Sequence, residues 1–92
     1  MTYVPPPPGF PRWTRSQETA GTCRFDGRSL MTVGVRDTLD PVDLIEITHH
    51  LHEGVRLLGG LDYLQVFKDR NARVVWAIDD GTHWTLLLPS EY

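Results

Sequence analysis

The sequence predicts an α+β domain in which one helix packs across a five-stranded antiparallel sheet, with the elements in the order ββαβββ. One long segment, 40–60, has a helical hydrophobic period together with a start signal and a stop signal that agree. On both sides of it lie short segments with the alternating pattern of strands, separated by glycine turns. We therefore expect a single domain over 21–92, preceded by a separate proline-rich, extended N-terminal arm over 1–20.

The arm carries four consecutive prolines at 5–8, which favour polyproline II structure because each ring fixes φ and keeps the preceding residue out of the helical region. Phe10 and Trp13 are its large apolar residues. The composition leaves two interpretations open. The arm is either a disordered leader, or a segment whose Phe10 and Trp13 dock on this domain or on a neighbouring copy.

Two strands are expected over 22–25 and 29–35, joined as a hairpin by Asp26-Gly27, a strong signal for a tight turn. The helix then begins at Asp40, a good N-cap, with Pro41 at its first position, and ends at Gly59-Gly60. Its apolar stripe, spaced by three and four residues, predicts the face that meets the sheet. That stripe comprises Leu44, Thr48, Leu51, Val55 and Leu58.

Three further strands are expected over 63–67, 73–79 and 82–88, with tight turns between them, and Pro89 ends the last strand. One side of the second strand, with Met31, Val33 and Val35, is expected to face the core. The expected core members are Leu44, Leu51, Val55, Leu58, Val33, Trp76 and Leu86. Because a single helix covers one face of a sheet, the other face should stay open to a partner or a second copy.

The net charge, the cysteine content and the hydrophobic pattern limit the classes of function that the sequence supports. The net charge of −3 argues against non-specific nucleic-acid binding, which normally requires a basic surface. A single cysteine, Cys23, excludes an internal disulfide and a zinc site built on thiolates, and fits a reducing cytosol. The N-terminus lacks the pattern of a signal peptide, and no apolar run approaches the roughly 18 residues of a membrane span. We expect a soluble cytoplasmic protein without membrane contact.

The histidine-rich part of the helix is the strongest candidate for a metal site. The pairs Glu46/His50 and His49/Glu53 stand one helical turn apart, a spacing that can chelate a metal ion. The spacing matches no known metal motif, however, and the four side chains fall opposite the apolar stripe, so we interpret them as a solvated polar face. His52 lies nearer the core edge and is expected to be half-buried.

Catalytic arrangements are poorly supported. Cys23 with His83 as a base, and the carboxylate pair Asp79-Asp80, are the combinations that the sequence offers, but turn formation already accounts for Asp80-Gly81. The chain has no phosphate-binding glycine loop, nucleophile elbow or RNA-reading aromatic motif. The sequence therefore predicts no enzyme, no cofactor and no bound metal.

The C-terminal run VVWAIDDGTHWTLLLPSEY resembles that of a family of small uncharacterised bacterial and phage proteins that end in W-x-I-D and a T-x-x-L-x-x-E-Y-like close. The matching residues are Trp76, Ile78, Asp79, Thr85, Leu88, Glu91 and Tyr92. The segment 30–35 resembles the strand that precedes the helix in that family. This resemblance implies a phage or mobile-element setting, in which compact acidic proteins inhibit host factors by binding them.

Together these observations predict a small non-catalytic protein that acts by protein–protein interaction as an inhibitor or accessory factor and forms a homodimer. The alternative is a protein that binds or sequesters a small ligand in a pocket between subunits; a metal-dependent enzyme ranks third. The expected interaction surface comprises Phe10, Trp13, Tyr63, Trp84, Glu46, His49, His50 and Glu53.

Overall fold

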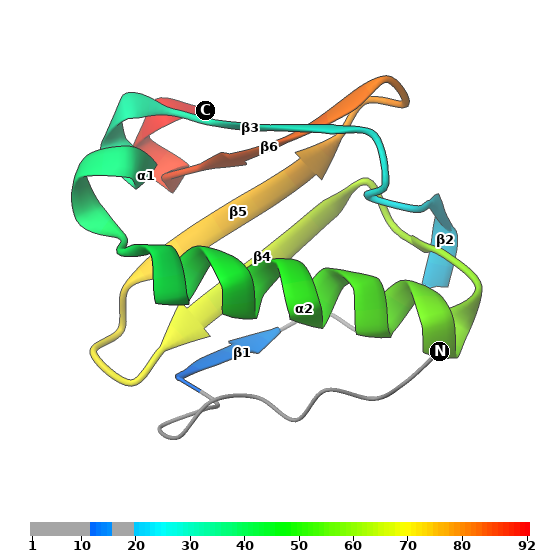
Figure 1. Ribbon diagram of the computed structural model, residues 1–92, viewed down its shortest axis with the longest axis horizontal. Coiled ribbons are helices and arrows are strands. Elements are labelled where there is room, and N and C mark those ends of the chain that lie inside the picture. Colours follow the sequence, from blue (N-terminus) through cyan, green and yellow to red (C-terminus); the bar gives the residue numbers. More distant parts are fainter. Residues whose placement is uncertain (1–11, 16–19) are drawn as a thin grey trace.

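The computed structural model describes residues 12–15 and 20–92, and it confirms an α+β fold with one main helix and a five-stranded sheet (Figure 1). The sheet order is β1-β4-β5-β6-β3. The elements are β1 (Trp13–Arg15), β2 (Ala20–Cys23), β3 (Arg28–Met31), α1 (Val33–Thr38), α2 (Pro41–Leu58), β4 (Leu64–Asp69), β5 (Val74–Asp79), β6 (His83–Leu87) and the 3₁₀ turn η1 (Pro89–Glu91).

The sheet is mixed, not wholly antiparallel. Strands β4, β5 and β6 form the expected antiparallel series, with small shifts at their ends, and β1 pairs antiparallel with β4. The other edge differs, because β3 runs parallel to β6. The fifth strand of the sheet is thus β1, from the segment expected to be an arm, while β2 is joined to Leu61 by isolated bridges.

The expected hairpin at Asp26-Gly27 is wrong, and Phe25 shows why. Its backbone is left-handed, with φ of 49°, and its side chain is fully buried with the ring edge-on to Trp84 at a centroid distance of 6.2 Å. Its N–H donates to Asp79 Oδ2 over 2.9 Å, and its carbonyl lies 3.1 Å from His52 Nε2. These contacts with the core hold the chain so that β3 continues along β6 instead of folding back on β2.

The expected strand over 29–35 is also too long, because Thr32 ends it and begins α1. The Thr32 hydroxyl accepts a hydrogen bond from the Val35 N–H over 3.3 Å, as an N-cap does. In the helix Val35 is buried, whereas Met31 and Val33 are 46% and 60% exposed. The expectation that these three residues share a core face is therefore wrong for Met31 and Val33.

The expected ends of α2 are confirmed. Asp40 and Asp43 form a reciprocal capping box, Pro41 is the first helical residue, and Gly59 ends the helix in a left-handed conformation with φ of 79°. The buried face is rotated from the expected stripe, since Leu44 and Val55 are partly buried and Leu58 is 43% exposed. The buried residues of α2 are Asp43, Glu46, Ile47, Leu51 and Gly54.

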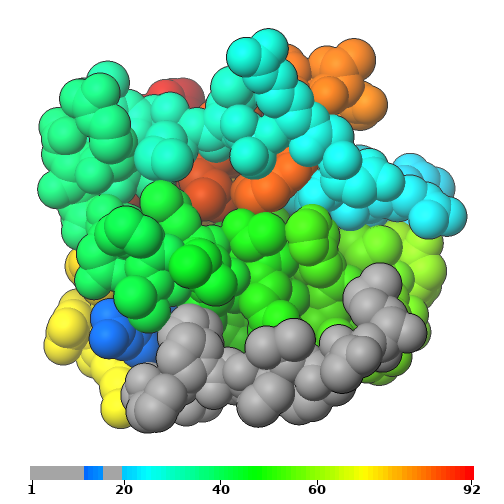
Figure 2. Space-filling model, in the orientation of Figure 1, coloured from blue at the N-terminus to red at the C-terminus, as the bar shows by residue number. Residues whose placement is uncertain are grey.

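The main core lies between α2 and one face of the sheet, which α2 crosses in Figure 1. The side chains of Phe67, Val75 and Leu86 lie on this face, as does Trp84. Figure 2 shows the same side of the molecule, with β6 visible between α2 and the chain around β3. None of the helices in the described residues is long and apolar enough to cross a membrane.

Candidate functional site

The face of the sheet that points away from α2 carries a series of apolar side chains. Register places Val66, Trp76 and Leu87 side by side across β4, β5 and β6, and Leu64 beside Ile78. Leu30 of β3 pairs with Thr85 on the same side and is 41% exposed. Trp76, expected in the core, is therefore half-buried on the opposite face. We call this surface the open face; it comprises Leu30, Leu64, Val66, Val74, Trp76, Ile78 and Leu87, of which Leu87 is only 7% exposed.

The C-terminal turn lies beside the open face. The Tyr92 ring meets the Trp76 ring edge-on at a centroid distance of 5.5 Å, and Tyr92 itself is 79% exposed. Glu91 fixes this turn, because it accepts hydrogen bonds from the Thr32 hydroxyl over 2.6 Å and from the Leu88 N–H over 2.9 Å. The first of these bonds, more than the second, holds the pKa of Glu91 below its usual value. The turn thus gives the open face an aromatic pair, Trp76 with Tyr92.

The histidine-rich helix face is built differently from a solvated polar face. Glu46 is fully buried, and its carboxylate accepts the backbone N–H groups of Arg12 (2.9 Å) and Trp13 (2.6 Å) and lies 3.1 Å from His50 Nε2. The expectation that Glu46 is solvated is therefore wrong, since this carboxylate satisfies backbone donors of β1.

Glu53 is bonded to Arg56 on the outer surface of α2, and that hydrogen bond lowers the Glu53 pKa. Among residues 12–15 and 20–92, no three His, Cys, Asp or Glu side chains come together in a way that could hold a metal ion. Glu46 therefore stabilises the fold by binding the backbone of the first strand, whereas Glu53 forms an ion pair on the surface of α2.

Trp13 is the anchor of β1. Its side chain is fully buried, its indole N–H donates to Asp43 Oδ1 over 2.9 Å, and the Arg73 guanidinium lies over its ring at 5.3 Å. Asp43 is itself 2% exposed and lies 3.8 Å from the Arg12 guanidinium. Of the two interpretations of the N-terminal arm, the structure supports docking on the same domain as far as Trp13 is concerned.

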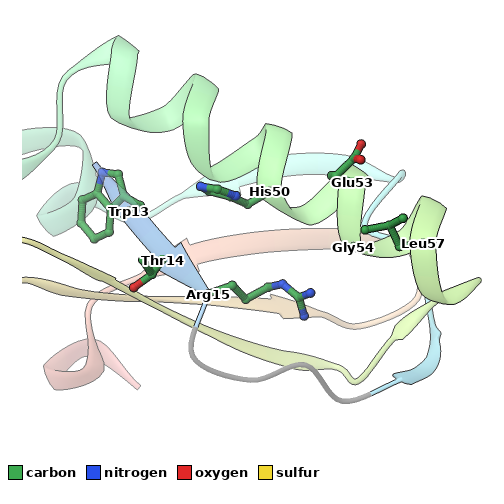
Figure 3. A pocket seen from close by; sticks show the side chains of 7 residues that line it. All are labelled: Trp13, Thr14, Arg15, His50, Glu53, Gly54 and Leu57. Atoms are coloured by element: carbon green, nitrogen blue, oxygen red, sulfur yellow. The ribbon is translucent and has the colours of Figure 1, made fainter. Parts of the chain in front are cut away.

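A groove of about 360 Å³ lies between β1 and the second half of α2 (Figure 3). The Arg15 side chain extends along it toward Gly54, and its Nη1 donates to Gln65 Oε1 over 2.9 Å. A Cβ atom at Gly54 would lie 3.0 Å from Arg15 Nη2, so glycine lets the arginine lie against the helix. The lining residues are Trp13, Thr14, Arg15, His50, Glu53, Gly54 and Leu57.

Some of the residues expected to form the interaction surface are buried in the structure, and others are exposed. Trp13, Trp84 and Glu46 are buried inside the domain and present no surface to a partner. Tyr63 is 51% exposed, and His49, His50 and Glu53 are partly exposed on α2. Phe10 lies outside the described residues. The alternation of Val74, Trp76 and Ile78 with Val75 and Ala77 was the sequence signal for the open face, although it does not reveal which side the helix covers.

Neither catalytic combination gains support. Burial, together with the nearby carboxylates of Asp79 and Asp62, raises the pKa of the Cys23 thiol, which disfavours the reactive thiolate. The His83 ring lies 3.0 Å from the Thr82 hydroxyl and 3.0 Å from Asp80 Oδ2, within its own turn. Asp79 accepts the N–H groups of Phe25 and Gly81, and Asp80 accepts those of Thr82 and His83, so both carboxylates hold the chain around the β5–β6 turn.

Comparison of the chain with protein-family models, with curated proteins and with solved structures found no match.

Proposed function

We propose that this protein is a small non-catalytic binding protein that acts by contact with another protein through the open face. The observation that carries the proposal is the position of Trp76, half-buried among Val66, Ile78 and Leu87 on the face that α2 leaves uncovered. Trp is the residue type most enriched among interface hot spots, and such residues act best within an apolar surround.

The dimensions of the open face suit the centre of a protein interface. Five strands about 4.8 Å apart, with about 3.3 Å per residue along each strand, give a surface on the order of 400 Å². A standard interface buries about 800 Å² on each partner. The open face would supply the apolar centre, and neighbouring polar residues such as Lys68, which lies on this side of the sheet near the end of β4, would supply part of the rim.

The resemblance of the C-terminal run supports a more specific setting. In that setting the protein belongs to a phage or mobile element, works in the cytoplasm, and inhibits or assists a host protein. Homodimerisation through open faces, which can pack about 10 Å apart as in a β-sandwich, would compete with the partner for the same surface, so a second copy is its alternative occupant.

The test compares two substitutions of the same chemistry at different places. Ile78→Lys puts a charge on the open face, whereas Ile45→Lys puts the same charge at a position on α2 that is already 62% exposed. Affinity capture from a host lysate should recover one protein with the wild type and with Ile45→Lys, and lose it with Ile78→Lys. Equal thermal unfolding of the two variants checks that both are folded.

Recovery of that protein at the same level with Ile78→Lys would contradict a role for the open face. Recovery of metabolites in place of a protein would favour the ligand-sequestering alternative.

A further inference from the structure

The first strand, β1, lies between α2 and the edge of β4. We call the space that it fills the α2–β4 groove; this space is distinct from the open groove of Figure 3, and the contacts that β1 makes in it suit a bound peptide. Trp13, Thr14 and Arg15 pair with residues 67–69 of the edge of β4. Glu46 accepts hydrogen bonds from the backbone N–H groups of Arg12 and Trp13, at the start of the segment. Asp43 accepts one from the indole N–H, and Gln65 accepts one from the Arg15 guanidinium. A strand that adds to a sheet edge, with side-chain pockets at alternate positions, is a common mode of peptide recognition.

Charge in the groove is complementary to this segment. Arg12 lies 3.7 Å from Asp40 and 3.8 Å from Asp43, and two carboxylates of the groove are at most 2% exposed. If β1 left, Asp43 would lose the indole donor but keep the Asp40 N–H and the nearby Arg73 guanidinium. Glu46 would lose two backbone donors and keep the contact with His50, while the edge of β4 would lose its partner. The loss of these hydrogen bonds and of the strand pairing makes the filled groove the more stable state.

We propose that the α2–β4 groove is a recognition site for an extended arginine–tryptophan segment, and that it accepts residues 12–15 from a second copy as well as from its own chain. Two chains would then exchange their first strands. The occupant is a second copy because residues 12–15 are the sequence whose fit is established, and because every contact made within one chain is reproduced between two.

This exchange is independent of the open face. Register places Trp13 on the α2 side of the sheet, beside Asp69, whereas Trp76 lies on the other side. A substitution at Trp76 can therefore abolish contacts of the open face while leaving strand exchange intact, so the two proposals can fail separately.

The test is a complementation experiment with two full-length variants. Trp13→Ala has a defective segment and an intact groove. Glu46→Gln has an intact segment and a defective groove. The two backbone N–H groups are bonded to different carboxylate oxygens, and in the amide one of these is replaced by an NH₂ group, which is a donor and cannot accept an N–H. The variants are mixed in equal amounts, warmed to just below the lower melting temperature so that β1 opens, cooled, and analysed by sedimentation and native mass spectrometry.

The expected result is a heterodimer that neither variant forms alone, since only the mixture combines an intact segment with an intact groove. The heterodimer should persist when both chains also carry Trp76→Ala. A mixture that contains monomers and no heterodimer would overturn the proposal. If Trp13→Ala does not fold, Trp13→Phe replaces it; this variant keeps an aromatic ring in the core and lacks the indole N–H.

A peptide of residues 9–17 gives a second measurement. Its addition to full-length Trp13→Ala, or to Trp13→Phe where that variant is used, should raise the melting temperature in a saturable way. The same peptide with alanine at position 13 should not. Stabilisation by the peptide without a heterodimer would keep the groove as a peptide site but overturn the second copy as its occupant. The absence of stabilisation would overturn the recognition site itself.

Discussion

Replacing Trp13 with alanine should remove about half of the stability of the fold, although this residue lies in a segment that the sequence places outside the domain. Truncation of a buried tryptophan costs about 3–5 kcal/mol, and Trp13 is fully buried. A domain of this size is stable by roughly 5–14 kcal/mol at typical values per residue. The single substitution should thus leave the protein folded, with roughly half of its free energy of unfolding.

The indole hydrogen bond can be separated from the packing of the ring. Trp13→Phe keeps most of the ring contacts and removes the donor to Asp43 Oδ1. A hydrogen bond to a charged group contributes about 1.5–3 kcal/mol, so Trp13→Phe should cost that amount and Trp13→Ala clearly more. A double-mutant cycle with Asp43→Ala, which removes the acceptor, should give a coupling free energy of about 1–2 kcal/mol, because the two side chains are in direct contact.

Urea denaturation followed by far-UV circular dichroism measures these differences. Trp76→Ala is the matched control, because it removes a tryptophan that is only half-buried on the other face of the sheet, and it should cost less than Trp13→Ala. Surface substitutions usually change stability by less than about 0.5 kcal/mol. A loss of that size for Trp13→Ala would refute the reasoning, since it would mean that β1 is not part of the stable fold.

Three further substitutions test other contacts. Ala72→Gly should stabilise the protein by about 0.5–1 kcal/mol in chemical denaturation, because Ala72 adopts a left-handed φ of 62° that glycine accepts without strain. Asn71→Gly in the same turn is the control and should not stabilise the protein. Burial alone would raise the pKa of Asp69, but the side-chain and backbone hydrogen bonds from Arg73 outweigh it and lower the pKa below that of the unfolded chain. Its stabilising contribution is therefore present above about pH 4 and lost as the pH falls below that, and Asp69→Asn should flatten the decline of the melting temperature in acid. An unchanged decline would exclude Asp69 as a source of acid sensitivity. Leu51→Asp should abolish cooperative melting because it buries an unpaired charge, whereas Leu57→Asp, at a position 66% exposed, should melt like the wild type; cooperative melting of Leu51→Asp would contradict the packing of α2.

The parts of the fold that could be predicted from the sequence are those fixed by neighbours along the chain. Asp40, Pro41 and Gly59 determine the ends of α2 through local capping, so their meaning is visible in a short window. The antiparallel series from β4 to β6 is likewise set by alternation and tight turns.

The parts that could not be predicted depend on contacts between distant residues. Asp26-Gly27 carries the local signal of a hairpin, but the position of Phe25 is fixed by Asp79, 54 residues away. Glu46 fits the pattern of a polar helix face, and it is buried because the segment that begins β1 packs on it and supplies its donors. An open face could be predicted because a single helix covers one side of a sheet. The residues that form it could not, because they depend on the register of the strands.

The placement of β1 and β3 at opposite edges of the sheet has a consequence for the order in which the protein forms. Both strands come early in the chain, yet their pairings close over long separations, 54 residues from Thr14 to Lys68 and 55 from Leu30 to Thr85. Long loops are slow to close, so the β4–β5–β6 series with α2 should make up the folding nucleus, and the edges should join afterwards. During synthesis on the ribosome, Trp13 could reach its buried position only after α2 and β4, which form that position, have been synthesised.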